Sequence, residues 1–357
     1  MNIQIGVYCP FRSLINPHQY GIARTFSMLR KYTQVKTQLI TSVKSNLSSR
    51  INSLILNATG QMEDQEAEIC CDDQNNDVIY FNNPDLIDSQ VLKVVANTPT
   101  VVTVNFKPDS YIRDIFGKEC NRQKEADALA SKLDKVSLLH FYSQNTRERF
   151  LNYRGDFEDK SIVIPYFVPV VSPIGNPIAD NTVRHILYID GRGSHYGITA
   201  LKKALKYLGS DYLKLNNIHI TVVSKYKPDS SSTEQLTWFA YGNNNQVLSL
   251  MQKASIVVLG TDDSADSSLL IQAMINKCAI IVDNNEIRTD ILGNCGIQIP
   301  FSASYKLVEA LSNLIENPAY RNQLAQSAQQ RANAFYHPLV VAQQYHNSFE
   351  KLINAWQ

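Results

Sequence analysis

Short runs of β-branched and other apolar residues recur along the chain, each followed by a polar or glycine-bearing turn and then by a stretch with helical spacing. Because the runs are continuous rather than alternating, they are typical of strands buried on both faces, as in parallel sheets. Strands that alternate with helices predict stacked βαβ units and an α/β fold. The predicted strands are Ile3–Tyr8, Val35–Thr41, Val78–Asn82, Thr100–Asn105, Val136–Tyr142, Ser161–Pro165, His185–Asp190, Ile218–Ser224, Ser255–Leu259, Ala279–Asp283 and Gly296–Ile299.

Two stretches between these strands have clear apolar faces at helical spacing. They are predicted helices that cover a sheet. The residues that share a face are Ile198, Leu201, Leu205 and Leu208 in one helix, and Leu307, Val308, Leu311, Leu314 and Ile315 in the other.

The length of 357 residues exceeds what one hydrophobic core usually supports, so two domains are expected. Four prolines between Pro165 and Pro177 favour a linker over the interior of an element. We therefore predict an N-terminal domain over 1–165, a linker over 166–183 and a C-terminal domain over 184–357. The last helix of the C-terminal domain either stays within that domain or packs back on the first one. The polar segment Asn57–Asp77 is predicted to be a surface excursion.

Charge and composition exclude several functional classes. Lys plus Arg is 34 and Asp plus Glu is 33, so the balance does not favour a nucleic-acid partner, which needs a concentrated basic face. The start lacks the pattern of a secretory signal, and no apolar run approaches the ~20 residues that span a bilayer. The six cysteines lack paired metal spacing. These features favour reduced thiols and a cytoplasmic protein.

Two loops of the second half follow predicted strands and open helices. In the first, Gly191, Arg192 and Gly193 precede Tyr196 and Gly197, and glycines next to a helix N-terminus suit a bound anion. Arginine adds a planar fork that fits phosphate. An ordinary structural turn is an equal alternative.

The other loop runs from Gly260 to Gln272, with Ser267 and Ser268 as expected N-cap residues of the following helix. A capped turn with solvated aspartates is its alternative. In the first half, Tyr20, Gly21 and Arg24 follow the first strand and are acceptor-side candidates, with a solvated loop face as the other interpretation. His140, inside a predicted buried strand, is expected to be a hydrogen-bonded core histidine.

The order and spacing of these motifs resemble the donor-binding half of GT-B glycosyltransferases, and among them the retaining family-4-type group. The likeness rests on Gly191-Arg192, on Tyr196-Gly197 and on Ser255–Gln272, and it covers most of residues 135–357. It extends to Ala279–Val282, Asp290–Gly296 and the closing helices from Glu316 to Tyr345. The resemblance implies two Rossmann-like parallel-sheet domains that face each other across a cleft and clamp a nucleotide-diphosphate sugar.

The resemblance also implies roles for individual residues. Arg192 matches the phosphate-binding arginine, and Gln272 falls where a glutamate of the family binds the ribose hydroxyls. Tyr196 replaces the family's lysine, and Asn105 stands where a catalytic-side histidine is often found. The implied catalytic residues are Arg192 and Asn105. The implied donor-binding residues are Gly191, Gly193, Tyr196, Ser224, Lys225, Tyr241, Gly242, Thr261, Ser264, Asp266, Ser267, Ser268, Leu269 and Gln272, and the acceptor-side residues are Tyr20, Gly21, Arg24 and Lys107.

Two functional hypotheses follow. The first is a retaining, metal-independent glycosyltransferase that uses the nucleotide sugar as co-substrate and needs no further cofactor. Its acceptor would be a glycan, a lipid-linked molecule or a protein. It would act in the cytoplasm or at the inner face of a membrane, with peripheral membrane contact. The alternative is a catalytically inactive GT-B module that serves as a partner or carbohydrate-binding subunit. Four family positions are altered here: Asn105, Tyr196, Gln272 and Ser264, which stands where a second glutamate of the family contacts the donor sugar. Epimerases and phosphorylases of the same architecture form a third, smaller group.

Overall fold

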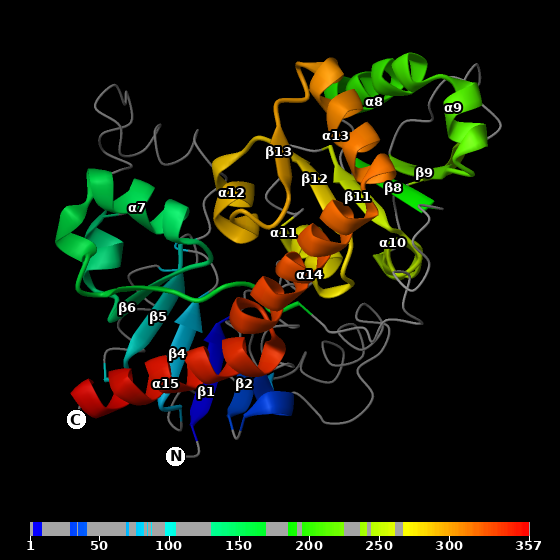
Figure 1. Ribbon diagram of the computed structural model, residues 1–357. Coiled ribbons are helices and arrows are strands. Elements are labelled where there is room, and N and C mark those ends of the chain that lie inside the picture. The colour runs from blue at the N-terminus through cyan, green and yellow to red at the C-terminus, as the bar shows by residue number, and fades with distance from the viewer. Residues whose placement is uncertain are drawn as a thin grey trace. The chain divides into compact units, whose positions relative to one another are not determined.

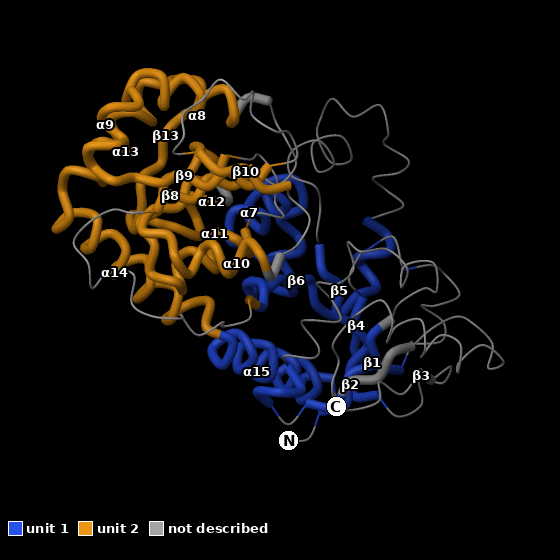
Figure 2. The backbone as a smooth tube through the Cα atoms, turned by 90° about the vertical axis from the view of Figure 1, so that its right-hand side faces the viewer, with its two compact units in different colours: residues 1–167, 338–357 blue, residues 168–337 orange. Residues whose placement is uncertain are grey.

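The computed structural model describes residues 3–8, 29–33, 35–40, 69–70, 76–81, 84, 87, 97–104, 130–168, 185–190, 195–224, 236–240, 244–260 and 267–356. The chain divides into two compact units (Figure 2). Unit 1 combines Met1–Phe167 with Pro338–Gln357, and unit 2 is the continuous segment Val168–His337. Among the described helices, none is both long and apolar enough to cross a membrane.

Unit 1 is built on a parallel sheet with seven described strands, in the order β3-β2-β1-β4-β5-β6-β7 (Figure 1). The short strand β3 pairs with β2 and lies inside the segment that was expected to be a surface excursion, so that prediction is wrong for these two residues. The strands are β1 (Gln4–Tyr8), β2 (Lys36–Ile40), β3 (Ile69–Cys70), β4 (Val78–Phe81), β5 (Thr100–Thr103), β6 (Leu138–Phe141) and β7 (Ser161–Val163).

Both faces of this sheet are covered, which explains why its strands read as continuous apolar runs. Helix α7 (Gln144–Tyr153) and the 3-10 helix η4 (Gly155–Phe157) contribute aromatic rings to one face. The other face is covered by the last helix, α15 (Pro338–Trp356), which Figure 1 shows lying across the strands. Successive residues of β4 alternate between the two clusters, with Val78 and Tyr80 toward α15.

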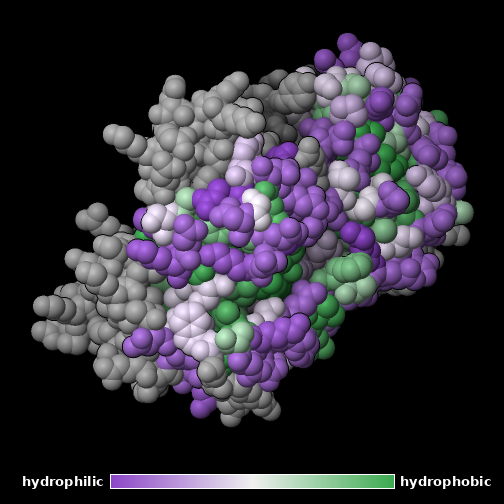
Figure 3. All heavy atoms as spheres, turned by 90° about the vertical axis from the view of Figure 1, so that its left-hand side faces the viewer, coloured by the Kyte–Doolittle hydropathy of each residue, from purple (hydrophilic) through white to green (hydrophobic). Residues whose placement is uncertain are grey.

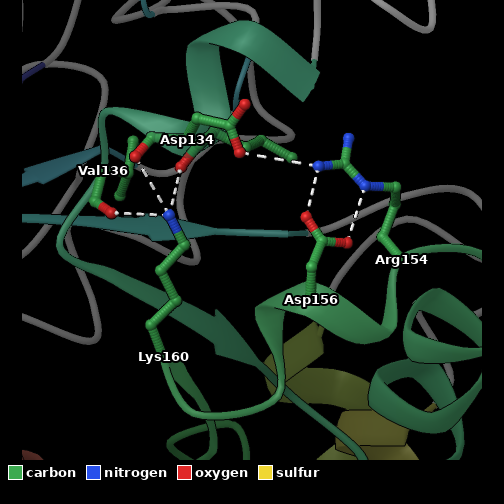
Figure 4. A network of polar contacts seen from close by, with 6 residues as sticks. Asp134, Val136, Arg154, Asp156 and Lys160 are labelled. Atoms are coloured by element: carbon green, nitrogen blue, oxygen red, sulfur yellow. Dashed lines mark hydrogen bonds and ion pairs between the residues drawn. The ribbon is translucent and has the colours of Figure 1, made fainter.

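A polar network orders the connection between α7 and β7 (Figure 4). The ammonium of Lys160 donates to the carbonyl oxygens of Leu133, Asp134 and Val136 at 3.0, 3.1 and 3.3 Å, and so caps the end of the helical segment 130–134. Arg154 bridges Asp156 and Asp134, and its hydrogen bond lowers the pKa of the Asp156 carboxyl. Figure 3 shows the side that carries α7, where hydrophilic residues predominate among the coloured atoms and smaller hydrophobic patches lie between them.

Unit 2 is built on a second parallel sheet, whose six described strands follow the order β10-β9-β8-β11-β12-β13. Strand β10 was not predicted; it pairs with β9 at the edge of the sheet, and its side chains are only half-buried. The strands are β8 (His185–Asp190), β9 (His219–Ser224), β10 (Leu236–Ala240), β11 (Ile256–Leu259), β12 (Ala279–Asp283) and β13 (Ile297–Ile299).

Helices cover both faces of the second sheet as well. Helices α8, α9 and α13 pack on one face, with the predicted apolar residues Leu201, Leu205, Leu307 and Leu311 in its core. Helices α10, α11 and α12 pack on the other face, and α14 contributes to both. Their bounds are α8 (His195–Leu208), α9 (Ser210–Leu215), α10 (Asn244–Met251), α11 (Ser267–Ile275), α12 (Glu286–Leu292), α13 (Ser304–Glu316) and α14 (Pro318–Phe335). The prediction of two Rossmann-like α/β units is confirmed.

Candidate functional site

The strand order of unit 2 singles out one position, at the carboxyl ends of its two central strands, β8 and β11. From β8 the chain passes through α8 toward β9, whereas from β11 it passes through α11 toward β12 on the opposite side. In parallel α/β sheets, ligands bind beyond the carboxyl ends of the strands where the connections diverge in this way. The carboxyl ends of β8 and β11 are therefore the candidate site of unit 2.

Three buried positions form the floor of this site. Asp190 ends β8 with 1% of its surface exposed, and it lies opposite Ser224 in the register of β8 and β9. Gly260 follows β11, and its N–H donates to the carbonyl oxygen of Ile189 at 3.0 Å. The base of the site thus consists of strand ends whose backbone positions are fixed by the hydrogen bonds of the sheet.

Helix α11 is the next described element after β11. It starts at Ser267, so Ser267 and Ser268 occupy its first turn and are not the N-cap residues that we expected. The N–H groups of the first turn have no partner within a helix, and together with the helix dipole they favour an anion. Ser267 and Leu269 are each 5% exposed, and Gln272, one turn further along, is 4% exposed. Every residue of the helix except Ser268 is buried, and most are apolar, so packing fixes the position of its N-terminus.

Helix α8 begins close by, at His195, and carries Tyr196 and Gly197 in its first turn. A β-carbon added to Gly197 would collide with the carbonyl oxygen of Gly260, so the two backbones are in direct contact. The starts of α8 and the β11–α11 connection therefore meet at the switch point.

Ser224 ends β9 and is buried, and its Oγ accepts a hydrogen bond from Nε1 of Trp238 at 3.2 Å. Trp238 packs against the core on the face of α8, so its ring serves the packing of the sheet. The other predicted donor-side residues lie outside the described residues: Gly191, Arg192, Gly193, Lys225, Tyr241, Gly242, Thr261, Ser264 and Asp266.

Unit 1 has the same kind of switch point between β1 and β4, because its strands follow the same 3-2-1-4 order. Tyr20, Gly21 and Arg24 follow β1 in the sequence, and Asn105 and Lys107 follow β5. All five lie outside the described residues, so their acceptor-side roles stay predictions.

His140 is a hydrogen-bonded core histidine, as predicted. It is 1% exposed, and its Nε2 lies 2.8 Å from the carbonyl oxygen of Ile164. Since a carbonyl only accepts, Nε2 carries the proton. Nδ1 accepts from one of the hydroxyls of Tyr80 and Thr103, which both lie 3.0 Å away and are hydrogen-bonded to each other. Tyr345 of α15 closes the cluster, with ring centroids 5.3 Å apart. Burial lowers the pKa of His140 to about 4.

Sequence reasoning missed one residue of the site. Tyr188 lies in the middle of β8, fully buried, and its ring reaches up to Gly197 and Gly260. The only signal was a tyrosine within an otherwise aliphatic stretch of strand.

No known family model matches the sequence, and no curated protein matches it. Solved structures match over nearly the whole chain. A glycosyltransferase from Rickettsia africae ESF-5 has a TM-score of 0.65 at 13% identity, and the match covers 99% of each chain. Anabaena Alr3699/HepE, solved in complex with UDP-glucose, has a TM-score of 0.64 at 12% identity, covering 98% of this chain and 100% of that one.

The chain has the GT-B fold. A protein from Listeria monocytogenes assigned as a UDP-N-acetylglucosamine 2-epimerase matches equally well, with a TM-score of 0.63 at 9% identity and coverage of 99% of this chain and 98% of that one. At such identities the likeness of GT-B structures establishes the fold, and the reaction has to be argued from the site.

Proposed function

We propose that the protein is a glycosyltransferase that binds a nucleotide-diphosphate sugar at the carboxyl ends of β8 and β11. The observation that carries this proposal is the backbone contact between Gly197 and Gly260, which joins the start of α8 to the segment leading into α11. The start of α8 meets the end of β11 at the switch point, and α11 follows β11 along the chain. Helix starts at such a point supply N–H donors to a ligand with two adjacent phosphates.

In this proposal the first turn of α11 holds the diphosphate. The N–H groups of Ser267, Ser268 and Leu269 face the position where negative charge accumulates as the sugar departs, and preorganised donors there lower the barrier. Arg192 adds the positive charge, with Lys225 or Lys107 as further sources. Gln272 shares hydrogen bonds with the ribose hydroxyls, because its amide both donates and accepts.

The acceptor side of the proposal belongs to unit 1. Tyr20, Gly21, Arg24 and Lys107 would contact a glycan, a lipid-linked or a protein acceptor, with Asn105 beside the reacting sugar. Retention of configuration and metal-independent, family-4-type chemistry complete the proposal; they rest on the sequence resemblance. The departing diphosphate itself can then take the proton of the acceptor hydroxyl.

Nucleotide binding is the first test. UDP, GDP, ADP and their sugars are screened by thermal and chemical denaturation, where a ligand at a hundred times its Kd adds about 2.7 kcal/mol to the free energy of unfolding. We expect stabilisation by one nucleotide series and slow hydrolysis of its sugar. Arg192→Ala should remove both effects, while Arg149→Ala on α7 should leave them unchanged.

The outcomes separate the functional classes. If no nucleotide stabilises the protein, the glycosyltransferase proposal is wrong. Stabilisation without hydrolysis or transfer for any donor would instead indicate the inactive GT-B module. Formation of an epimerised nucleotide sugar would indicate an epimerase.

A further inference from the structure

We propose that Tyr188 is a positioning residue that sets the spacing between the two donor-side segments, and so controls the affinity for the nucleotide diphosphate. This inference rests on the proposed function. It concerns the buried side chain of Tyr188 in β8, whose end lies against Gly260 at the candidate site. No sequence motif described above assigns it a role.

The geometry is a three-way contact. A β-carbon on Gly260 would lie 2.7 Å from Cζ and 3.0 Å from Cε2 of Tyr188, and closer still to its hydroxyl. A β-carbon on Gly197 would lie 2.5 Å from the same hydroxyl. The end of the Tyr188 ring therefore lies against the backbone of α8 and of the β11–α11 connection at once.

Space, and not backbone conformation, requires glycine at both positions. Neither Gly197 nor Gly260 has a positive φ, whereas Gly209 and Gly293 do. An alanine is therefore compatible with the backbone at 197 and 260 but has no room. Tyr188 cannot swing away easily, because it is fully buried in the core beneath α8 and interiors are close-packed.

A displacement at this contact is passed on to both segments that the proposal assigns to the diphosphate. The segment through Arg192 enters α8 just before Gly197, and the segment through Asp266 leaves Gly260 for Ser267. A shift of about 1 Å in a positioning element can reduce a rate about a hundredfold. The backbone N–H groups of α11 are equally sensitive, because they cannot adjust by changing rotamer.

Gly296 offers a matched control. A β-carbon there would lie 2.7 Å from Cδ2 of Leu292 and 3.0 Å from the carbonyl oxygen of Ile280. The crowding is comparable and lies in the same unit. However, Gly296 precedes β13 and so lies at the amino-end edge of the sheet, opposite the candidate site.

The experiment measures the Kd for UDP and the midpoint of urea unfolding without ligand, in the full-length protein, for Gly260→Ala, Gly296→Ala and Gly260→Ala combined with Tyr188→Leu. We expect both single variants to lose stability, but only Gly260→Ala to raise the Kd, by about tenfold or more. The shorter leucine should restore most of that affinity, because the three atoms nearest to a β-carbon at Gly260 all belong to Tyr188, and the alanine methyl would then fill the room left by the end of that side chain.

Equal Kd changes in the Gly260 and Gly296 variants, or no rescue by Tyr188→Leu, would overturn the positioning role while leaving nucleotide binding intact. A wild-type protein that binds neither UDP nor any other nucleotide would overturn the proposed function itself, and the positioning role with it.

Discussion

Burial keeps His140 neutral in the folded protein, with a pKa of about 4 against its ordinary value of 6.5. In the unfolded chain the imidazole of His140 takes up a proton below about pH 6.5, whereas in the folded chain it does so only near pH 4. Stability should therefore fall as the pH decreases through this window and level off below it. The loss is about 1.4 kcal/mol per pH unit and about 3 kcal/mol in total, from this one residue.

Urea midpoints between pH 7.5 and 4.5 test this expectation. His140→Gln should be less stable at neutral pH, because it loses the hydrogen bonds to Tyr80 and Ile164, and its stability should change less with pH. If wild type and His140→Gln show the same slope, another group is responsible.

Residue chemistry was the least predictable level of the site. The burial of His140 was correctly predicted, since an apolar strand surrounds it. Tyr188 was missed because its role depends on Gly197 and Gly260, which the fold brings to it from other elements. The expected caps Ser267 and Ser268 proved to be first-turn residues, since local preference does not fix a helix start within one or two positions.

At the level of elements, α15 is held by the core of unit 1. Phe349 is fully buried and packs edge-on against Tyr80, with ring centroids 6.4 Å apart. Phe349→Ala should lower the free energy of unfolding by about 3–5 kcal/mol, as for other buried aromatic truncations. Phe335→Ala, at the end of α14 with 52% of its surface exposed, should cost less than about 1 kcal/mol.

Chemical denaturation of both variants measures these costs. Similar losses in the two would mean that α15 contributes no more to the core than an exposed position does, which would contradict the packing described for unit 1.

Interior strands with continuous apolar runs were predicted to the residue, as β8 and β12 show. β3 is only two residues long. β10 is a half-buried edge strand whose apolar residues include Trp238 and Phe239 in place of the valines and isoleucines of the interior strands. The apolar face of α15 predicts a helix but does not specify its partner. That choice is made by Tyr80 and other residues far away in the sequence.

The whole molecule has an asymmetric construction. Unit 2 is one continuous segment, Val168–His337, with both of its core clusters inside it, whereas unit 1 needs Pro338–Gln357 to complete one of its faces. A fragment of residues 168–337 should therefore unfold cooperatively on its own. A fragment of residues 1–167 should not, because five apolar residues of α15 are missing from its core.

Urea unfolding followed by circular dichroism distinguishes the two fragments, and adding a peptide of residues 338–357 to the fragment 1–167 should restore a cooperative transition. A cooperative transition of residues 1–167 alone would contradict the expectation, as would a non-cooperative one for residues 168–337.

The discontinuity of unit 1 also orders events on the ribosome. The sheet of unit 1 is synthesised first, but the helix that covers one of its faces emerges only after all of unit 2 has been translated. At about 5–20 residues per second, that face stays uncovered for roughly 10–40 s. During this interval Val78, Tyr80 and their neighbours offer a surface that a holding chaperone can recognise, while unit 2 is already able to fold. A nascent chain stalled before residue 338 would thus carry unit 2 in folded form, while the sheet of unit 1 would still lack the helix that covers one of its faces.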